Sequence, residues 1–223
     1  MNAIDVGGLF NVRASGIDAP WLLRSGAVDD LTPTGVERLR TLGVSVIVDL
    51  REPHETGRAA HGIRVASVPI YGAEPPRVGH LEDIYAALIR NRGHALARAV
   101  AEIADAEHAA LVHCTAGKDR TGLVVALALL AGGADPADVV ADYALSGRDV
   151  RPVRERVARE IAAAAPAELR QETLRLHLDS PPDAMRQLLD HIAELGGAAA
   201  YLRAHGLTDD QLDALRTKHG SAG

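Results

Sequence analysis

The stretch from Ala109 to Gly122, AALVHCTAGKDRTG, constrains the fold of this chain more than any other. A short apolar run ends at Val112 and is followed by His113 and by Cys114, the only cysteine of the chain. After a polar loop that contains a glycine, a second apolar run extends over 123–130. This order predicts a strand, a tight loop and a helix.

A loop between such a strand and helix favours the binding of an anion. Its backbone N–H groups turn toward one point and the positive end of the helix dipole adds to them, so phosphate is the natural ligand. The same donors favour the thiolate of Cys114, which makes this residue a candidate nucleophile. Arg120 presents a planar fork that can hold two phosphate oxygens and stabilise charge during phosphoryl transfer. The remaining residues expected at the phosphate are Thr115, Ala116, Gly117, Lys118 and Thr121.

Other interpretations of the same residues are possible. A lone cysteine is often a small buried apolar residue rather than a nucleophile. A Walker A loop requires Gly-Lys followed by Ser or Thr, whereas Asp119 follows Lys118 here. A zinc site needs three or four ligands, and His113 would project away from Cys114 if the strand continued through both. We therefore expect no metal.

The pattern of His113-Cys114, five residues and Arg120-Thr121 resembles the signature loop of the cysteine-dependent protein phosphatases. The fuller string HCTAGKDRTG is similar to that of the atypical bacterial tyrosine phosphatases. The resemblance covers most of the chain and implies an α/β fold, with a central mostly parallel sheet flanked by helices and a helical C-terminal third. It also implies phosphatase activity without a cofactor. Further similar segments are Arg24-Ser25-Gly26, Leu31-Thr32-Pro33, Asp49-Leu50-Arg51, Tyr201-Leu202-Arg203 and residues 206–209.

Length and composition restrict the function further. The 223 residues can bury a full core, and we expect a single domain over 1–223, with the sheet in 1–132 and a helical part in 133–223. A net charge of −6 argues against a nucleic-acid partner. One cysteine fits a reducing compartment, and neither a signal pattern nor an apolar run of about 18 residues occurs. We expect a cytoplasmic protein without stable membrane association, with a monomer favoured.

Turn residues and apolar periodicity predict the elements along the chain. Thr32 as N-cap and Pro33 at the first helical position start a helix that Gly43 ends. The β-branched run of 44–51 predicts a strand that is covered on both faces. Further strands are expected over 21–26 and 63–70, and helices over 81–89, 94–104, 120–131, 136–143, 151–164, 167–178, 182–195 and 208–218.

The carboxyl ends of parallel strands meet at one edge of a sheet, which places Asp49 where it can face Cys114. Glu52 and Glu55 are expected in a solvated, ion-paired loop. Only a short connector joins the strand ending near Ile70 to the helix at residue 81. The lid-like insertion found in some members of the family that this chain resembles is therefore absent there. We expect a more open site.

The implied reaction has two steps, and its general acid is open. The Cys114 thiolate attacks phosphorus while an acid protonates the leaving oxygen, and water then hydrolyses the phosphocysteine. We rank Asp119 first as the acid because the resemblance assigns this function to the aspartate before the loop arginine. Asp49 is second and Asp83 third, and Glu82 occupies a comparable position. His113 is expected to hydrogen-bond the loop and support the thiolate, whereas His54, His61, His80 and His177 are expected at the surface.

Lys118 bears on the substrate. A phosphotyrosine or mixed phosphoprotein activity is favoured, but a second cation in the loop also resembles lipid phosphatases that act on phosphoinositides. A silent phosphate-binding module is disfavoured because Cys114, Arg120 and Thr121 are all present. The expected partner is thus a phosphorylated protein or a phosphoinositide.

Overall fold

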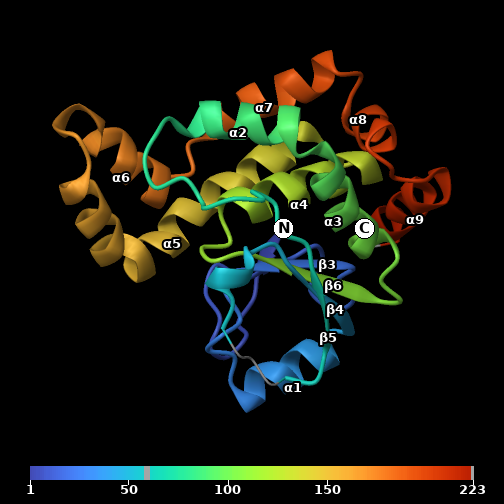
Figure 1. Ribbon diagram of the computed structural model, residues 1–223. Helices are drawn as coiled ribbons and strands as arrows, with labels where there is room; N and C mark the ends of the chain where they lie inside the picture. The colour runs from blue at the N-terminus through green and yellow to red at the C-terminus, as the bar shows by residue number, and fades with distance from the viewer. Residues whose placement is uncertain (58–60, 222–223) are drawn as a thin grey trace.

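The computed structural model describes residues 1–57 and 61–221 (Figure 1). In these ranges six strands form one sheet in the order β1-β2-β3-β6-β4-β5. The pairs β3-β6, β6-β4 and β4-β5 are parallel, and β1-β2 and β2-β3 are antiparallel. The predicted α/β fold with a mostly parallel central sheet is confirmed. The strands are β1 (Asn2–Ala3), β2 (Arg13–Ala14), β3 (Leu22–Ser25), β4 (Val44–Asp49), β5 (Arg64–Ser67) and β6 (Ala109–His113).

Helices cover both faces of the sheet (Figure 1). Helix α1 lies on one face, and α3 and α4 lie on the other, with the remaining helices packed outside or beside them. Within the described residues, the strands all precede the signature loop and the elements after it are helices. The helices are α1 (Pro33–Thr41), α2 (Leu81–Asn91), α3 (Gly93–Ala104), α4 (Asp119–Gly132), α5 (Pro136–Ala164), α6 (Arg170–Leu178), α7 (Pro182–Glu194), α8 (Ala198–Ala204) and α9 (Asp209–Gly220), with short 3₁₀ turns at Pro53–Glu55 and Ala167–Leu169.

The central strands are apolar because both of their faces are buried. In β4, Ile47 joins the core on the α1 side, whereas Val46 and Val48 join the core under α3 and α4. Strand β6 alternates in the same way, with Leu111 on the α1 side and Val112 on the other. Both faces of such a strand contact the hydrophobic core, which explains its continuous apolar sequence.

Local sequence signals set the ends of α1 as predicted. The Thr32 side chain accepts a hydrogen bond from the backbone N–H of Gly35, and Pro33 occupies the first turn. Gly43 follows the helix with φ of 75°, a left-handed conformation that glycine adopts without a steric penalty. The chain then enters β4 directly.

One predicted break is absent, because α5 runs without interruption from Pro136 to Ala164. We expected two helices, over 136–143 and 151–164. Pro152 lies inside the helix, where a proline removes one backbone hydrogen bond and normally bends or ends the element. It is exposed here, so the carbonyl that loses its partner can be solvated. The helix therefore continues and carries its C-terminal half past the sheet toward α6 (Figure 1).

The strand register brings polar residues together at one edge. Ser25 of β3 and Asp49 of β4 both pair with His113, the last residue of β6. The signature loop leaves the sheet at this point, between its two parallel neighbours. None of the helices in the described ranges is long and apolar enough to cross a membrane.

Candidate active site

The signature loop joins β6 to α4. Cys114 directly follows β6 and is 2% exposed, and α4 begins at Asp119. Gly117 has φ of 68°, and a Cβ atom at this position would lie 2.2 Å from the carbonyl oxygen of Ser25. Only glycine combines this backbone conformation with so close an approach to β3.

Side chains from the N-terminal segment hold the loop carbonyls. Asn11 donates from its side-chain amide to the carbonyls of Ala116 at 3.1 Å and Gly117 at 2.9 Å, and Arg24 donates to the Gly117 carbonyl at 2.8 Å. Among the described residues, no hydrogen-bond acceptor is bound to the backbone N–H groups of 115–118. The carbonyls are thus tied down on the outside of the loop while the N–H groups are left for an anion.

A buried ionic network lies behind these contacts. Asp142 of α5 accepts from Arg13 at 2.6 Å and from Arg24 at 2.6 Å, and Ser146 accepts from both arginines. Burial opposes ionisation of Asp142, but the two guanidinium groups hold its pKa below the usual value. The network connects β2, β3 and α5 to the signature loop and stabilises the conformation of the loop.

The loop opens into a cavity of about 110 Å³. Three sequence-predicted chemical groups line it together, namely Cys114, Asp119 and Arg120. Residues of α5 and α6 also line the cavity. The other lining residues are Glu55, Tyr71, Pro75, Pro76, Thr115, Ala116, Arg154, Leu176 and His177.

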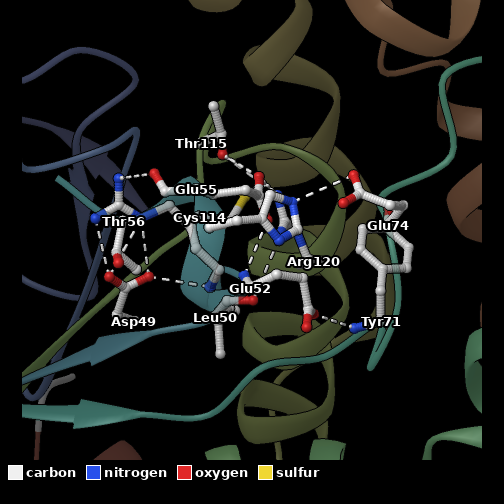
Figure 2. Close-up of polar contacts among 12 residues, drawn as sticks. Asp49, Leu50, Glu52, Glu55, Thr56, Tyr71, Glu74, Cys114, Thr115 and Arg120 are labelled. Atoms are coloured by element: carbon white, nitrogen blue, oxygen red, sulfur yellow. Dashed lines mark hydrogen bonds and ion pairs between the residues drawn. The ribbon is translucent and has the colours of Figure 1, made fainter.

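Glu55 binds the loop arginine directly (Figure 2). Its two carboxylate oxygens accept from Arg120 NH1 at 2.5 Å and NH2 at 2.8 Å, and the Thr115 hydroxyl donates to Oε1 at 2.6 Å. Burial works against the charge, but these donors lower the pKa of Glu55 to about 2. The Arg120 guanidinium also lies 5.0 Å from the ring centre of Tyr71. The expectation of a solvated loop was wrong for Glu55.

The Glu55 contact leaves part of the guanidinium available. A guanidinium can bind a planar partner through the NH1/NH2 edge or the Nε/NH2 edge. Glu55 occupies the first edge, and within the described chain Nε of Arg120 has no hydrogen-bond partner. The second edge can therefore receive phosphate oxygens while Glu55 keeps the side chain in place.

Glu52 is also buried rather than solvated, and it braces the neighbouring segment. Its carboxylate accepts hydrogen bonds from the backbone N–H groups of Tyr71 at 2.9 Å and Gly72 at 3.1 Å (Figure 2). Through this contact it fixes the position of the Tyr71 ring beside Arg120.

The Lys118 ammonium group is bound by acceptors of the protein itself. Its side chain is fully buried, and its ammonium group donates to Asp119 Oδ1 at 2.7 Å and to the carbonyl of Asp179 at 2.8 Å. It is not among the residues that line the cavity. Asp119 itself is 20% exposed and also accepts a hydrogen bond from the Tyr85 hydroxyl at 2.7 Å.

Asp49 lies beside the site rather than in it. Arg51 binds both of its carboxylate oxygens, at 2.9 to 3.2 Å, and also binds Asp29 at 2.5 Å. The nearest loop residue is His113, whose Nε2 lies 3.6 Å from Asp49 Oδ2. The structure does not bring Asp49 into the cavity that Cys114 lines.

His113 supports the loop from within the core. Its Nδ1 lies 3.3 Å from the carbonyl oxygen of Cys114. Burial lowers its pKa to about 4, although the nearby Asp49 carboxylate acts in the opposite direction. The imidazole is therefore neutral at pH 7.

The α2 carboxylates do not reach the cavity. Glu82 forms an ion pair with Arg175 of α6, and Asp83 is exposed. His61 differs from the expected surface position because it is buried, whereas His177 is partly exposed, lines the cavity and contacts the carbonyl of Arg77 at 2.8 Å. Periodicity marks both α2 carboxylates as helix-surface residues but cannot show which helix faces the site.

Thr121 is buried behind the loop. Its hydroxyl has no hydrogen-bond partner among the described residues. A buried hydroxyl without a partner is uncommon and often has a functional reason. No group of three or more His, Cys, Asp or Glu side chains in the described ranges could hold a metal ion.

The family model and the curated relatives that match this chain are described as phosphatases. A family model described as the tyrosine phosphatase family matches residues 1–219. A tyrosine-protein phosphatase of Nostoc commune is 25% identical, over 95% of this chain and 78% of the relative. The triple specificity protein phosphatase PtpB of Mycobacterium tuberculosis is 28% identical, over 87% of this chain and 89% of the relative. The solved structure of P. aeruginosa TpbA is 19% identical and matches 98% of this chain and 95% of its own, with a TM-score of 0.44.

Proposed function

Because the chain belongs to the tyrosine phosphatase family, we propose that it hydrolyses phosphotyrosine in proteins through a phosphocysteine intermediate. The observation that carries this proposal is the shared cavity of Cys114, Asp119 and Arg120, above a loop whose N–H groups are free to bind an anion. A nucleophile, an acid and a phosphate clamp are the groups that this reaction needs.

In the first step the Cys114 thiolate attacks phosphorus. The new S–P bond forms as the P–O bond to the tyrosine oxygen breaks, and Asp119 donates its proton to that oxygen. The Nε/NH2 edge of Arg120 and the loop N–H groups bind the equatorial phosphate oxygens and stabilise their charge in the transition state. Thr115, Ala116, Gly117 and Lys118 contribute through their backbone.

In the second step water hydrolyses the phosphocysteine. The carboxylate of Asp119 takes a proton from the water as its oxygen attacks phosphorus, and the S–P bond breaks. The sulfur leaves as a thiolate, and the otherwise unpartnered hydroxyl of Thr121 is the group we assign to stabilise it. His113 keeps the loop in place as a neutral imidazole. Cys114 then returns to its starting form.

The cavity walls favour an aromatic phosphate. Tyr71, Pro75, Pro76 and Leu176 provide apolar surface in the same cavity as the charged groups. A phenyl ring can bury its faces there, whereas a serine phosphate would leave this surface uncovered. A relative is named a triple specificity phosphatase, so activity on phosphoserine and phosphothreonine is a secondary part of the proposal.

Phosphoinositides are the weaker candidate. The argument for them depends on Lys118 as a second cation at the substrate, but its ammonium group is bound to Asp119 and to the Asp179 carbonyl. Turnover of a phosphotyrosine peptide and of phosphoinositide vesicles should be compared between the wild type and Lys118→Met. Equal losses on both substrates would remove the lipid argument.

The main test measures hydrolysis of a phosphotyrosine peptide and of p-nitrophenyl phosphate, with and without a chelator. We expect activity that the chelator leaves unchanged and that Cys114→Ser lowers by several orders of magnitude. Activity that survives in Cys114→Ser would exclude the covalent mechanism. A wild-type chain that binds phosphate without turnover would instead identify a binding module.

A further inference from the structure

Tyr85 lies outside the signature loop, yet its hydroxyl contacts the proposed acid. It belongs to α2, is 1% exposed, and donates to Asp119 Oδ1 at 2.7 Å. Lys118 donates to the same oxygen at 2.7 Å. Both hydrogen bonds therefore end on Oδ1, and no hydrogen bond from the described part of the chain reaches Oδ2.

The number of hydroxyl protons determines which of Tyr85 and Tyr143 donates the hydrogen bond between them. The hydroxyl oxygens of Tyr85 and Tyr143 lie 2.8 Å apart in the core, and each carries one proton. Because Tyr85 gives its proton to Asp119, Tyr143 must donate to Tyr85. Burial raises the pKa of both tyrosines, so the two phenols keep their protons and this order of donors persists.

The two bonds to Oδ1 determine where Asp119 carries a proton. A protonated carboxyl group has one hydrogen, on one of its two oxygens. An oxygen that already accepts from a phenol and an ammonium group is the unfavourable place for it. When Asp119 acts as the acid, its proton therefore belongs on Oδ2, the oxygen that neither Tyr85 nor Lys118 binds.

Lys118 and Tyr85 differ in how well each can fix the orientation of the Asp119 carboxyl group. Lys118 is the neighbour of Asp119 in the chain and moves with the same loop. Tyr85 is anchored in α2, which packs on α7 and carries Tyr85 into the main core. A contact from a separate element can fix the carboxyl plane relative to the cavity, as a preorganised acid requires.

We propose that Tyr85 is a positioning residue, which holds Asp119 so that Oδ2 faces the leaving oxygen, with Tyr143 behind it. This inference rests on the proposed function, because it requires Asp119 to be the acid. Asp119 acts in both steps, but only its protonation of the leaving oxygen in the first step depends on which leaving group the substrate carries. Its positioning is therefore visible in kcat/KM, which reports the first step, as a dependence on the leaving group.

The test uses Tyr85→Phe with two substrates, phenyl phosphate as the poor leaving group and p-nitrophenyl phosphate as the good one. We expect kcat/KM on phenyl phosphate to fall about tenfold, the effect of losing one hydrogen bond to a charged group. On p-nitrophenyl phosphate we expect kcat/KM to fall by less than about twofold. Tyr143→Phe should show a smaller change in the same direction.

Tyr201→Phe is the matched control. Its hydroxyl is also buried and donates a hydrogen bond, at 2.7 Å to the carbonyl of Ile89, but it does not line the cavity. It removes a comparable hydroxyl from the core, so its ratio of the two kcat/KM values should equal that of the wild type. Thermal unfolding of each variant separates any loss of folded protein from a change in kcat/KM.

Asp119→Asn distinguishes the two ways of failing. If Asp119→Asn shows no selective loss on phenyl phosphate, the assignment of the acid fails and the inference fails with it. If Asp119→Asn is selective but Tyr85→Phe loses activity equally on both substrates, or not at all, the inference is overturned while the proposed function stands. A selective loss in Tyr85→Phe that disappears in the Asp119→Asn background supports the inference.

Discussion

Burial shifts the pKa values of several side chains around the loop, and the shift of His113 is the clearest. Burial lowers its pKa to about 4 in the folded protein, against about 6.5 in the unfolded chain. Between these pH values the unfolded state binds a proton that the folded state does not. The free energy of unfolding therefore falls as the pH falls through this window, by up to about 3 kcal/mol.

Urea unfolding of the wild type and of His113→Gln at pH 7, 6 and 5 checks this expectation. The variant should start less stable and show a flatter dependence on pH, because it lacks the titrating group. Parallel curves for the two proteins would mean that His113 does not titrate differently on folding.

Glu55 is a second residue whose charge we expect to matter. With its pKa lowered to about 2, it stays ionised throughout the range of an ordinary assay. Glu55→Gln removes the charge-assisted bonds that hold Arg120, and we expect kcat/KM on p-nitrophenyl phosphate to fall about tenfold. Glu74→Gln changes an exposed carboxylate paired with His54 and should stay within about twofold of the wild type.

An increase in activity for Glu55→Gln would contradict this account. It would mean that the carboxylate competes with the substrate phosphate for Arg120 instead of keeping the guanidinium in place.

At the scale of elements, the loop depends on α5 and on the first strands. Asp142 neutralises Arg13 and Arg24 in the core, and Arg24 in turn holds the Gly117 carbonyl. Asp142→Asn would leave the buried Arg24 without a carboxylate partner and Arg13 with only Asp149 at 3.4 Å, and we expect a destabilisation of about 3–5 kcal/mol together with a lower kcat/KM.

Asp149→Asn is the control for that prediction. Its carboxylate is 23% exposed and lies 3.4 Å from Arg13, so its loss should cost at most about 1 kcal/mol. Urea unfolding measures both variants. Equal losses would show that the helix rather than the buried ion pairs is sensitive to substitution.

The same scale shows why some elements could be predicted and others could not. Strand β4 and the start of α1 depend on nearby residues, which is why β-branched residues and the Thr32 cap predicted them correctly. The break expected between residues 143 and 151 was wrong because one proline does not end a helix when its surroundings are solvated. No helix was predicted where α8 lies, and only the segment Tyr201-Leu202-Arg203, which is similar to the family, marked this region.

For the molecule as a whole, the loop residues could be assigned from the sequence because their spacing is local. Their partners could not, since contacts such as Asn11 with Gly117 and Tyr85 with Asp119 depend on how distant segments pack. Glu55 had the sequence context of a surface charge. The wall that α5 and α6 provide was likewise invisible, because periodicity shows that a helix has an inner face but not what it covers.

Cys114 is the only cysteine of the whole chain, and it lies at the base of the cavity. Oxidation by peroxide converts a thiolate to a sulfenic acid, which a second thiol can trap as a disulfide before further oxidation. This chain has no second thiol, so a slower condensation with a backbone nitrogen or an external thiol must intervene before the sulfinic acid forms. We expect dithiothreitol to restore activity after brief peroxide exposure and progressively less after longer exposure, as activity assays and intact mass will show. Full recovery after long exposure would contradict this, and the duration of oxidative stress would otherwise set how much of the enzyme survives it.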